Sequence, residues 1–309
     1  MSLITDTILG FVVGDAMGVP VEFESREYLK ENKIEKMEGY MSYMQPAGTW
    51  SDDSSMTLAT IDSIIEKKVI DYEDMMNKFV NWYQDAAYTA TDMMFDIGNT
   101  TREALNLYLD GFEPLNCGFG GIYDNGNGSL MRMLPIALYT YYKNIKDEML
   151  YEIVKDTSSL THSHPISIMG CYIYVKFIHF LIETKDKNNS YNNIKNINYQ
   201  KYFDKETILK YDKLFDDIYK RNLDEICSSG YIVSTLEAVF YVILNNNNTY
   251  KDAILEAINL GEDTDTIGAI TGSIISILSN DIPENWLGEL KKRQLVDEIS
   301  KEFEKCLVK

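Results

Sequence analysis

Apolar residues along much of this chain recur at the spacing of helices. Intervals of three and four residues define two clear runs: Leu58, Ile61, Ile64 and Ile65, and then Ile267, Ile270, Ile274 and Ile277. This spacing places the side chains on one helical face, whereas a strand would alternate apolar and polar residues. Alternating Val- and Ile-rich runs between turns are scarce. The pattern predicts an all-α protein.

The size of the chain bears on its domain organisation. Its 309 residues would suggest two domains of roughly 150 residues each, and 45% of them are hydrophobic. No linker divides the sequence into two cores, so we expect one compact multi-helix domain over residues 1–309. Asn, Lys and Tyr crowd residues 185–205. Such a composition buries little apolar surface, which predicts a surface insertion there.

Two clusters of acids and hydroxyls stand where the two apolar helices are expected to begin. They are Ser51-Asp52-Asp53-Ser54 and Asp263-Thr264-Asp265-Thr266. Oxygen ligands of this kind suit hard cations such as Mg²⁺, Mn²⁺ and Ca²⁺. The same residue types also cap ordinary helix starts. Capping accounts for either cluster alone, but not for the same compact pattern in both, so the pair predicts a binuclear cation site.

The amino-terminal segment adds a third acid. Ile4, Ile8 and Phe11 fall on one helical face, and Asp15 continues the same stripe. An inward-facing carboxylate needs polar partners or a metal ion, so Asp15 either serves a site or caps a neighbouring helix. Glycines around it permit close backbone approach, and Pro20 should end the helix.

Two further segments could bind a ligand. Glycines in the segment 118–129 permit positive φ, so that successive N–H groups could surround a pyrophosphate, although the segment matches no Walker or dinucleotide fingerprint and could be only a long turn. His162 and His164 lie two residues apart, on different faces of a helix, which disfavours zinc binding. His179 lies in an apolar run and is interpreted as a core residue.

The composition limits the partners. A formal net charge of −19 disfavours nucleic acid, because phosphate binding needs clustered Lys and Arg. The four widely spaced cysteines contain no CxxC pair, which favours reduced thiols. Residues 4–13 form an apolar run too short to span a bilayer, and no basic region precedes a signal core. We therefore expect a cytoplasmic protein without a membrane partner.

Taken in order, the motifs resemble those of the ADP-ribosylglycohydrolases, which include hydrolases of ADP-ribosylated dinitrogen reductase, arginine and serine. The resemblance covers nearly the whole chain and is carried by GDAMGVPVE at 14–22, SDDS at 51–54, FDIGNTT at 95–101, NGNGSLMR at 125–132, THSHP at 161–165 and GEDTDTIG at 261–268. It implies an all-α domain with two Mg²⁺ or Mn²⁺ ions, Mg²⁺ foremost, in a cleft between helix starts.

The resemblance also implies roles for individual residues. Ser51, Asp52 and Asp53 would hold one ion, Asp263 and Thr266 the other, and Asp265 would reach both. The expected ligand-binding residues are Asp15, Asp96, Asn125, Gly126, Asn127, Gly128, Ser129, Met131 and His162. Asp52, Asp53 and Asp265 would position the ions and orient the nucleophile, while Glu22 or Asp96 would manage protons. Tyr88, Phe95 and Tyr123 are candidate adenine neighbours only because they lie near these motifs.

The sequence departs from the family pattern at a few positions. Ser51 and Ser54 replace the usual Thr but keep the hydroxyl, so metal ligation should survive. Glu262 replaces a usual Gly and is expected to add bulk and charge beside the metal. Ser234 stands where an Asp is common, and the sequence does not explain that change.

The leading hypothesis is a metal-dependent hydrolase that removes ADP-ribose from an arginine or serine side chain of a protein, or from a small ADP-ribose conjugate. Two alternatives remain open. Glu262 and Ser234 motivate a non-catalytic ADP-ribose or nucleotide sensor, and the same ions could serve a metal-dependent phosphatase.

Overall fold

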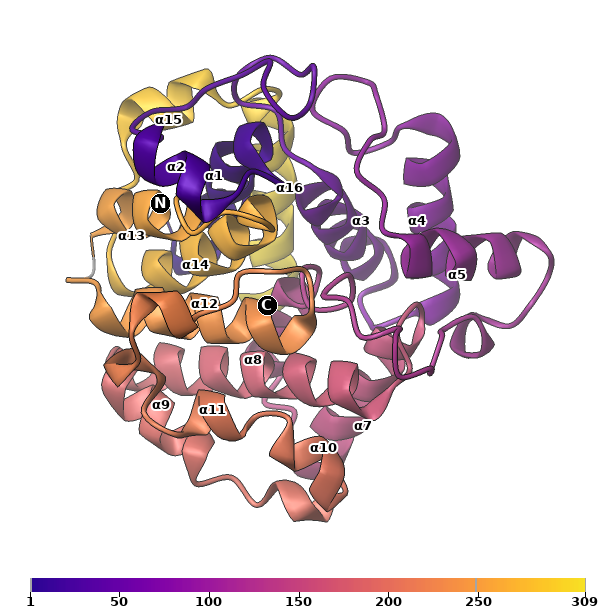
Figure 1. Ribbon diagram of the computed structural model, residues 1–309. Coiled ribbons are helices and arrows are strands. Elements are labelled where there is room, and N and C mark those ends of the chain that lie inside the picture. The colour runs from indigo at the N-terminus through magenta and orange to yellow at the C-terminus, as the bar shows by residue number, and fades with distance from the viewer. Residues whose placement is uncertain (1, 248, 309) are drawn as a thin grey trace.

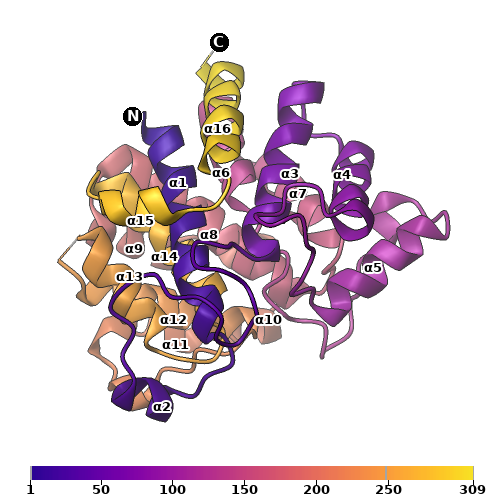
Figure 2. The ribbon, with the colours of Figure 1, turned by 90° about the horizontal axis from the view of Figure 1, so that it is seen from above.

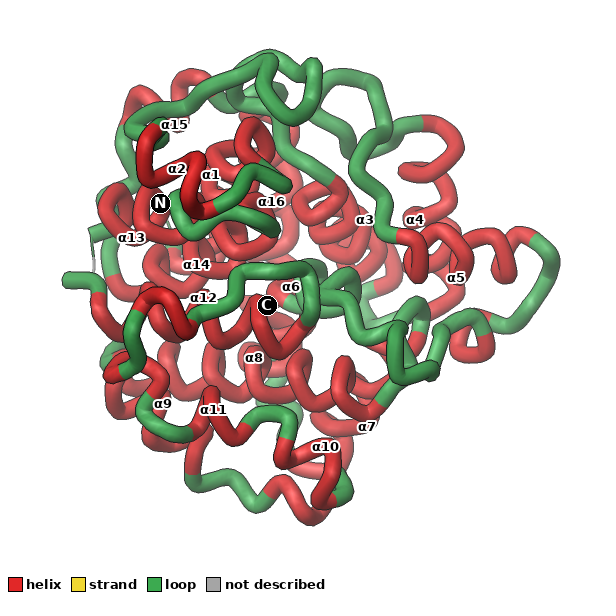
Figure 3. The backbone as a smooth tube through the Cα atoms, viewed as in Figure 1, coloured by secondary structure: helices red, strands yellow, loops and turns green. Residues whose placement is uncertain are grey.

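Helices form all the regular structure of residues 2–247 and 249–308, the part of the chain that the computed structural model describes (Figures 1 and 3). Within these residues, β-pairing is limited to two isolated bridges. The α-helices are α1 Leu3–Gly18, α2 Arg26–Glu31, α3 Asp52–Lys67, α4 Tyr72–Asp85, α5 Asn99–Leu109, α6 Leu134–Tyr142, α7 Asp147–Ser159, α8 Pro165–Thr184, α9 Lys187–Lys195, α10 Lys205–Leu209, α11 Asp212–Phe215, α12 Ile232–Asn245, α13 Tyr250–Ile258, α14 Thr264–Leu278, α15 Glu284–Glu289 and α16 Arg293–Val308. The all-α prediction is confirmed.

The two helices expected after the acid clusters are α3 and α14. Ser51 is the N-cap of α3, and Asp263 occupies the N-cap position of α14. The apolar residues that predicted these helices are buried, apart from the partly buried Ile65. Figure 1 places α3 with α4 and α5 on one side of the molecule and α14 with α1 and α13 on the other.

Helices α1 and α14 pack backbone to backbone, side by side in Figures 1 and 2. A Cβ added to Gly14 would lie 2.1 Å from the carbonyl oxygen of Gly268, so no larger residue fits without a shift. Gly18 approaches Thr264, whose hydroxyl donates to the Gly18 carbonyl at 2.8 Å. This antiparallel contact brings the end of α1 to the start of α14, and α1 is buried on every side rather than along one stripe.

The segment 185–205 corrects one expectation. It contains α9 and a 3-10 turn, and α9 packs against α8 and α12. Tyr191 and Ile194 are buried, and the Tyr191 hydroxyl donates to the Leu214 carbonyl. The expectation that this segment buries little apolar surface is wrong, because its few apolar side chains lie three residues apart on the face that meets the core.

Two apolar segments have the length and composition of membrane spans, 3–21 and α8. These windows are 100% and 78% buried inside the fold. The first is longer than the run 4–13 considered from sequence, because the helix and the following 3-10 turn continue it. All four cysteines are free. His179 is buried and hydrogen-bonded to Thr140 and the Ala137 carbonyl, which confirms it as a core residue.

Candidate active site

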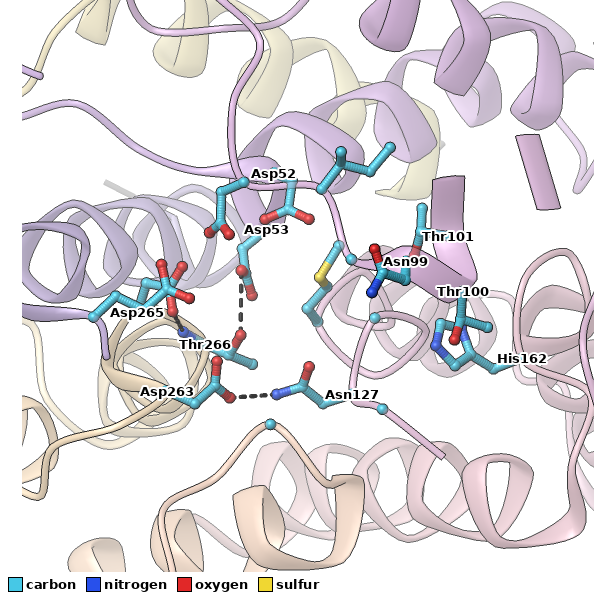
Figure 4. A pocket seen from close by; sticks show the side chains of 18 of the residues that line it. Asp52, Asp53, Asn99, Thr100, Thr101, Asn127, His162, Asp263, Asp265 and Thr266 are labelled. Atoms are coloured by element: carbon cyan, nitrogen blue, oxygen red, sulfur yellow. Dashed lines mark hydrogen bonds between the residues drawn. The ribbon is translucent and has the colours of Figure 1, made fainter. Parts of the chain in front are cut away.

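A cleft of about 340 Å³ lies where the starts of α3, α5 and α14 meet two loops. Acids line one side, and Asn127 and His162 lie on the other (Figure 4). The full lining is Glu22, Phe23, Asp52, Asp53, Asp96, Ile97, Gly98, Asn99, Thr100, Thr101, Gly126, Asn127, Gly128, Met131, His162, Gly230, Asp263, Asp265 and Thr266. Segments far apart in sequence therefore build one site.

The start of α3 is capped by Ser51 and by Asp15 from α1. The Ser51 side chain accepts from the Asp53 amide at 3.2 Å. The Asp15 carboxylate accepts from the Ser51 amide at 2.9 Å and from the Ser54 amide at 3.0 Å, and the Ser54 hydroxyl also donates to it. These contacts satisfy the helix end, so Asp52 and Asp53 face the cleft. Asp15 itself does not line the cleft.

The start of α14 is held differently. Asp263 makes no side-chain cap, and its Oδ2 accepts from the side-chain amide of Asn127. The Thr266 hydroxyl donates to Asp53 Oδ2 at 3.2 Å and so joins the two acid clusters directly. Figure 4 shows both contacts between the labelled residues. The predicted metal residues of α3 and α14 thus meet in space. The Ser51 hydroxyl donates a hydrogen bond to Asp53 from outside the cleft lining.

Five carboxylates form two overlapping groups at this meeting point. One oxygen each from Glu22, Asp263 and Asp265 lie within 4.8 Å of one another, and the same holds for Asp52, Asp96 and Asp265. Asp265 belongs to both groups, as the resemblance implied. Glu22 and Asp96, which sequence reasoning assigned to proton handling, stand among the candidate metal ligands. The sequence offered no signal for that, because both acids lie outside the two clusters.

Burial and mutual repulsion raise the pKa values of these acids. Burial is the larger cause for Glu22, whose pKa rises to about 11, with the charges of Asp96 and Asp263 next. The pKa of Asp263 rises to about 7, chiefly by burial. The pKa values of Asp52, Asp53 and Asp265 lie well above the ordinary range for the same two reasons. A cation among them would favour the ionised forms.

Two orphaned oxygens test whether the site suits a metal ion. Oδ1 of Asp53 and Oε2 of Glu22 are buried and have no hydrogen-bond partner. A buried carboxylate oxygen left without a partner is costly. Carboxylates and hydroxyls without a nearby thiolate are the ligands of hard cations. The residues present therefore fit Mg²⁺ or Mn²⁺.

The glycine-rich loop forms the opposite wall. Gly126, Asn127 and Gly128 line the cleft together with Met131. A Cβ on Gly128 would lie 2.9 Å from the His162 ring, so glycine is needed for this close approach. Burial, and then the charge of Arg132, lowers the pKa of His162 to about 3. His162 is therefore a neutral hydrogen-bonding group at physiological pH.

Asn125 and Ser129 support this loop from behind. Asn125 Oδ1 accepts from the Ser167 hydroxyl at 2.9 Å, and its carbonyl accepts from the Ile232 amide. Ser129 is fully buried and bonds Ser158 and Cys171. Neither residue lines the cleft, unlike the other expected members of the loop, but Asn125 does line an adjoining hollow that shares Gly126 with the cleft.

The three aromatic residues suggested as adenine neighbours do not line the cleft either. The Tyr88 hydroxyl donates to Asp62, and Phe95 packs against Tyr43 with ring centroids 4.9 Å apart. Tyr123 is 97% exposed beside a neighbouring hollow. Sequence reasoning missed Phe23, and nothing in the sequence pattern distinguishes it.

Glu262 has a structural explanation. Its φ of +62° lies in the left-handed region, where glycine is most easily accommodated, which accounts for the usual Gly at this position. Its side chain is exposed and does not line the cleft, so the expected bulk beside the metal is absent. Its charge does contribute to raising the pKa of Asp263. Nothing in the structure explains Ser234.

Comparison with known proteins extends over the whole chain. The family model ADP-ribosylglycohydrolase matches residues 2–308. The ADP-ribosylarginine hydrolase Tri1 of Serratia proteamaculans (strain 568) is 30% identical, over 96% of this chain and 77% of its own length. The ADP-ribosyl-[dinitrogen reductase] glycohydrolase of Rhodospirillum rubrum is 28% identical, over 91% and 88%.

A solved structure supports the same fold. A chain of an "ADP-ribosylglycohydrolase-related protein complex" superposes with a TM-score of 0.82 at 22% identity, covering 98% of this chain and 97% of that one. The helical fold, the cleft of paired acid groups and the family match agree. The chain therefore belongs to the ADP-ribosylglycohydrolase family of hydrolases.

Proposed function

We propose that this enzyme is a metal-dependent hydrolase that releases ADP-ribose from modified arginine side chains. The observation that carries the proposal is the pair of carboxylate groups that share Asp265 at one end of the cleft. The similarity to an ADP-ribosylarginine hydrolase favours an arginine linkage over serine.

The two carboxylate groups would each hold one divalent cation. Glu22 and Asp263 would bind one, Asp52 and Asp96 the other, and Asp265 both. Asp53 has an unpartnered Oδ1 to offer either ion, and Thr266 orients Asp53 through its hydroxyl. When bound, such ions supply charge stabilisation and lower the pKa of a water molecule that can attack the sugar.

The rest of the cleft would hold the nucleotide. The distal ribose would lie against the acids, with the pyrophosphate along the backbone of Gly126–Gly128. A second hollow of about 440 Å³ shares Gly126 and Gly230 with the cleft and is lined by Tyr123, Tyr231 and Lys210. Its exposed aromatic faces suit adenine stacking, and Lys210 offers a positive charge near the pyrophosphate in a chain of net charge −19.

Cleavage of the bond between the ribose and the arginine guanidinium passes through an oxocarbenium-like state. The carboxylates around the distal ribose would stabilise its positive charge. The departing guanidine needs a proton, which would come from solvent water, because Glu22 and Asp96 would be ionised when they hold a cation. The Tyr43 hydroxyl donates to Asp96 Oδ1 at 2.7 Å and would hold that carboxyl in place.

The test is release of free ADP-ribose from matched arginine-linked and serine-linked peptides with Mg²⁺, Mn²⁺ or chelator. We expect metal-dependent release from the arginine-linked peptide. Release only from the serine-linked peptide would contradict the linkage, and undiminished release in chelator would contradict the metal. Inorganic phosphate as product would indicate a phosphatase, and tight ADP-ribose binding without release from either peptide would indicate a sensor.

A further inference from the structure

We propose that two loops at the mouth of the cleft form a docking surface for the polypeptide that carries the modified arginine. We name this surface the acceptor shelf and define it as residues 39–47 and 91–97 together with Phe23. The inference rests on the proposed function, because it identifies where the acceptor side of that substrate binds.

The two loops are joined to each other. The Thr91 hydroxyl donates to Gln45 Oε1 at 2.9 Å. The ring of Tyr43 lies 4.9 Å from that of Phe95, and its hydroxyl donates to Asp96, which lines the cleft. The Tyr43 ring also lies 6.3 Å from that of Phe23, another lining residue. The acceptor shelf is therefore continuous with the catalytic end of the cleft.

Four large side chains with apolar surface are more than half exposed on this shelf. Met44 is 79% exposed, Phe23 72%, Tyr40 64% and Met93 58%. Single exposed apolar residues are common on proteins, but several around one cleft mark an interaction surface. The second hollow, which is lined by Tyr123 and Tyr231 and is proposed to hold adenine, shares Gly126 and Gly230 with the cleft. The acceptor shelf lies instead beside the acids of the cleft, where the bond between ADP-ribose and the arginine would be cleaved.

The chemistry of the shelf suits a cationic, variable segment. Neither loop contains a Lys or Arg, and their only charged residues are Asp92 and Asp96. Lys292, from outside the shelf, pairs with Asp92 at 2.6 Å. Aromatic faces attract guanidinium groups, and the adaptable side chains of methionine accept varied sequences. The two exposed methionines of the shelf, Met44 and Met93, would thus bind arginine-containing segments without a strict sequence requirement.

The shelf has a defined backbone before any partner binds. Phe23, Tyr40 and Asp92 have φ values of +67°, +60° and +57°, in the left-handed region. The Phe23 amide donates to the Glu262 carbonyl at 2.7 Å, and the Tyr40 amide to the Gln45 carbonyl at 2.8 Å. A surface held in this way loses little conformational freedom on binding.

The experiment compares free ADP-ribosylarginine with an arginine-ADP-ribosylated peptide of about ten residues, long enough to extend beyond the cleft at ~3.3 Å per residue. In the Met44→Ser/Met93→Ser double variant, KM for the peptide should rise about fivefold or more. Its kcat should stay unchanged, and its kcat/KM for ADP-ribosylarginine should change by less than twofold. Retained activity on the small conjugate also shows that the variant folds.

Met149→Ser is the matched control, because Met149 is 62% exposed on α7, away from the shelf. It should leave both substrates unaffected. An unchanged peptide KM in the double variant, or an equal loss on both substrates, would overturn the acceptor shelf. A changed oligomeric state with an unchanged peptide KM would assign the surface to self-association instead. If the wild-type enzyme cleaved neither substrate, the proposed function would fail separately.

Discussion

The starts of α3 and α14 carry nearly the same acid and hydroxyl pattern, yet they are held in different ways. At α3, Ser51 and Asp15 satisfy the helix amides, and the anchor comes from the buried helix α1. At α14, the Asp263 side chain does not cap the helix and instead accepts a hydrogen bond from Asn127 of the glycine-rich loop. In both places, the acids are directed into the cleft rather than used as caps.

We infer from this difference that the geometry of each half of the site depends on a different part of the protein. The α3 half is tied to the protein core through Asp15, so its geometry should depend on the stability of the fold. The α14 half is tied to the loop proposed to bind the nucleotide, so its geometry should respond to the ligand. Asp265 belongs to both carboxylate groups and connects the two halves.

Removal of the shared carboxylate should have the largest effect. Asp265→Asn takes one charged oxygen from both groups, and we expect kcat/KM for an arginine-linked substrate to fall about 10³-fold or more. Steady-state kinetics at saturating Mg²⁺ measures this. Asp85→Asn, the same change at an exposed position at the end of α4, should have no effect. Retained activity in Asp265→Asn would refute the shared role.

Asp15→Asn tests the core-anchored half. The NH₂ group of Asn is a donor and cannot accept the hydrogen bonds that Ser51 and Ser54 donate to the carboxylate. This loss should reduce the free energy of unfolding by about 3 kcal/mol. Urea denaturation in chelator measures the loss. Asp71, the cap of α4, accepts a single hydrogen bond from the Asp74 amide, so Asp71→Asn should cost at most about 1 kcal/mol. Equal losses in the two variants would contradict the anchoring role of Asp15.

Asn127→Ala tests the loop-anchored half. The variant removes the donor to Asp263 and to Thr235, and we expect Mg²⁺ affinity to fall about 10- to 100-fold, as for other groups that orient a metal ligand. Isothermal titration calorimetry would show this. Asn81→Ala, on the exposed side of α4, serves as the control. Unchanged Mg²⁺ binding would show that Asp263 needs no support from the loop.

The pH dependence of stability tests the acids of both halves together. The pKa of Glu22 is raised to about 11 in the folded protein, so Glu22 keeps its proton in the folded state while the unfolded chain is already ionised. The free energy of unfolding therefore falls as pH rises towards 11, and Asp52, Asp53 and Asp265 are shifted in the same direction. In chelator, Tm should therefore fall by about 5 °C or more from pH 7 to pH 9. His162 and His179 are neutral throughout this range and contribute nothing.

Mg²⁺ should remove that fall, since a bound cation favours the ionised carboxylates. Thermal unfolding at pH 7, 8 and 9, with chelator or with Mg²⁺, makes the comparison. The same decline in Tm with chelator and with Mg²⁺ would mean that these acids do not bind the cation.

The sequence alone determined the helical class, the beginnings of α3 and α14 and the family. Periodic apolar positions and capping residues act within a few residues of one another, so these features can be read locally. The ordered motifs also located the acids of the cleft, although not their grouping. The same local reasoning misjudged residues 185–205, because composition does not reveal that Tyr191 and Ile194 share one buried face.

Only the tertiary structure decided which side chains meet. The close contact between Gly14 and Gly268 brings α1 and α14 together, and so sets Glu22 beside Asp263 and Asp265. The left-handed backbone of Asp96 brings its carboxyl to Asp52 and Tyr43. Asn125 and Ser129 support the loop instead of lining the cleft. These outcomes depend on distances between segments remote in the chain, which packing and loop geometry set and local pattern does not encode.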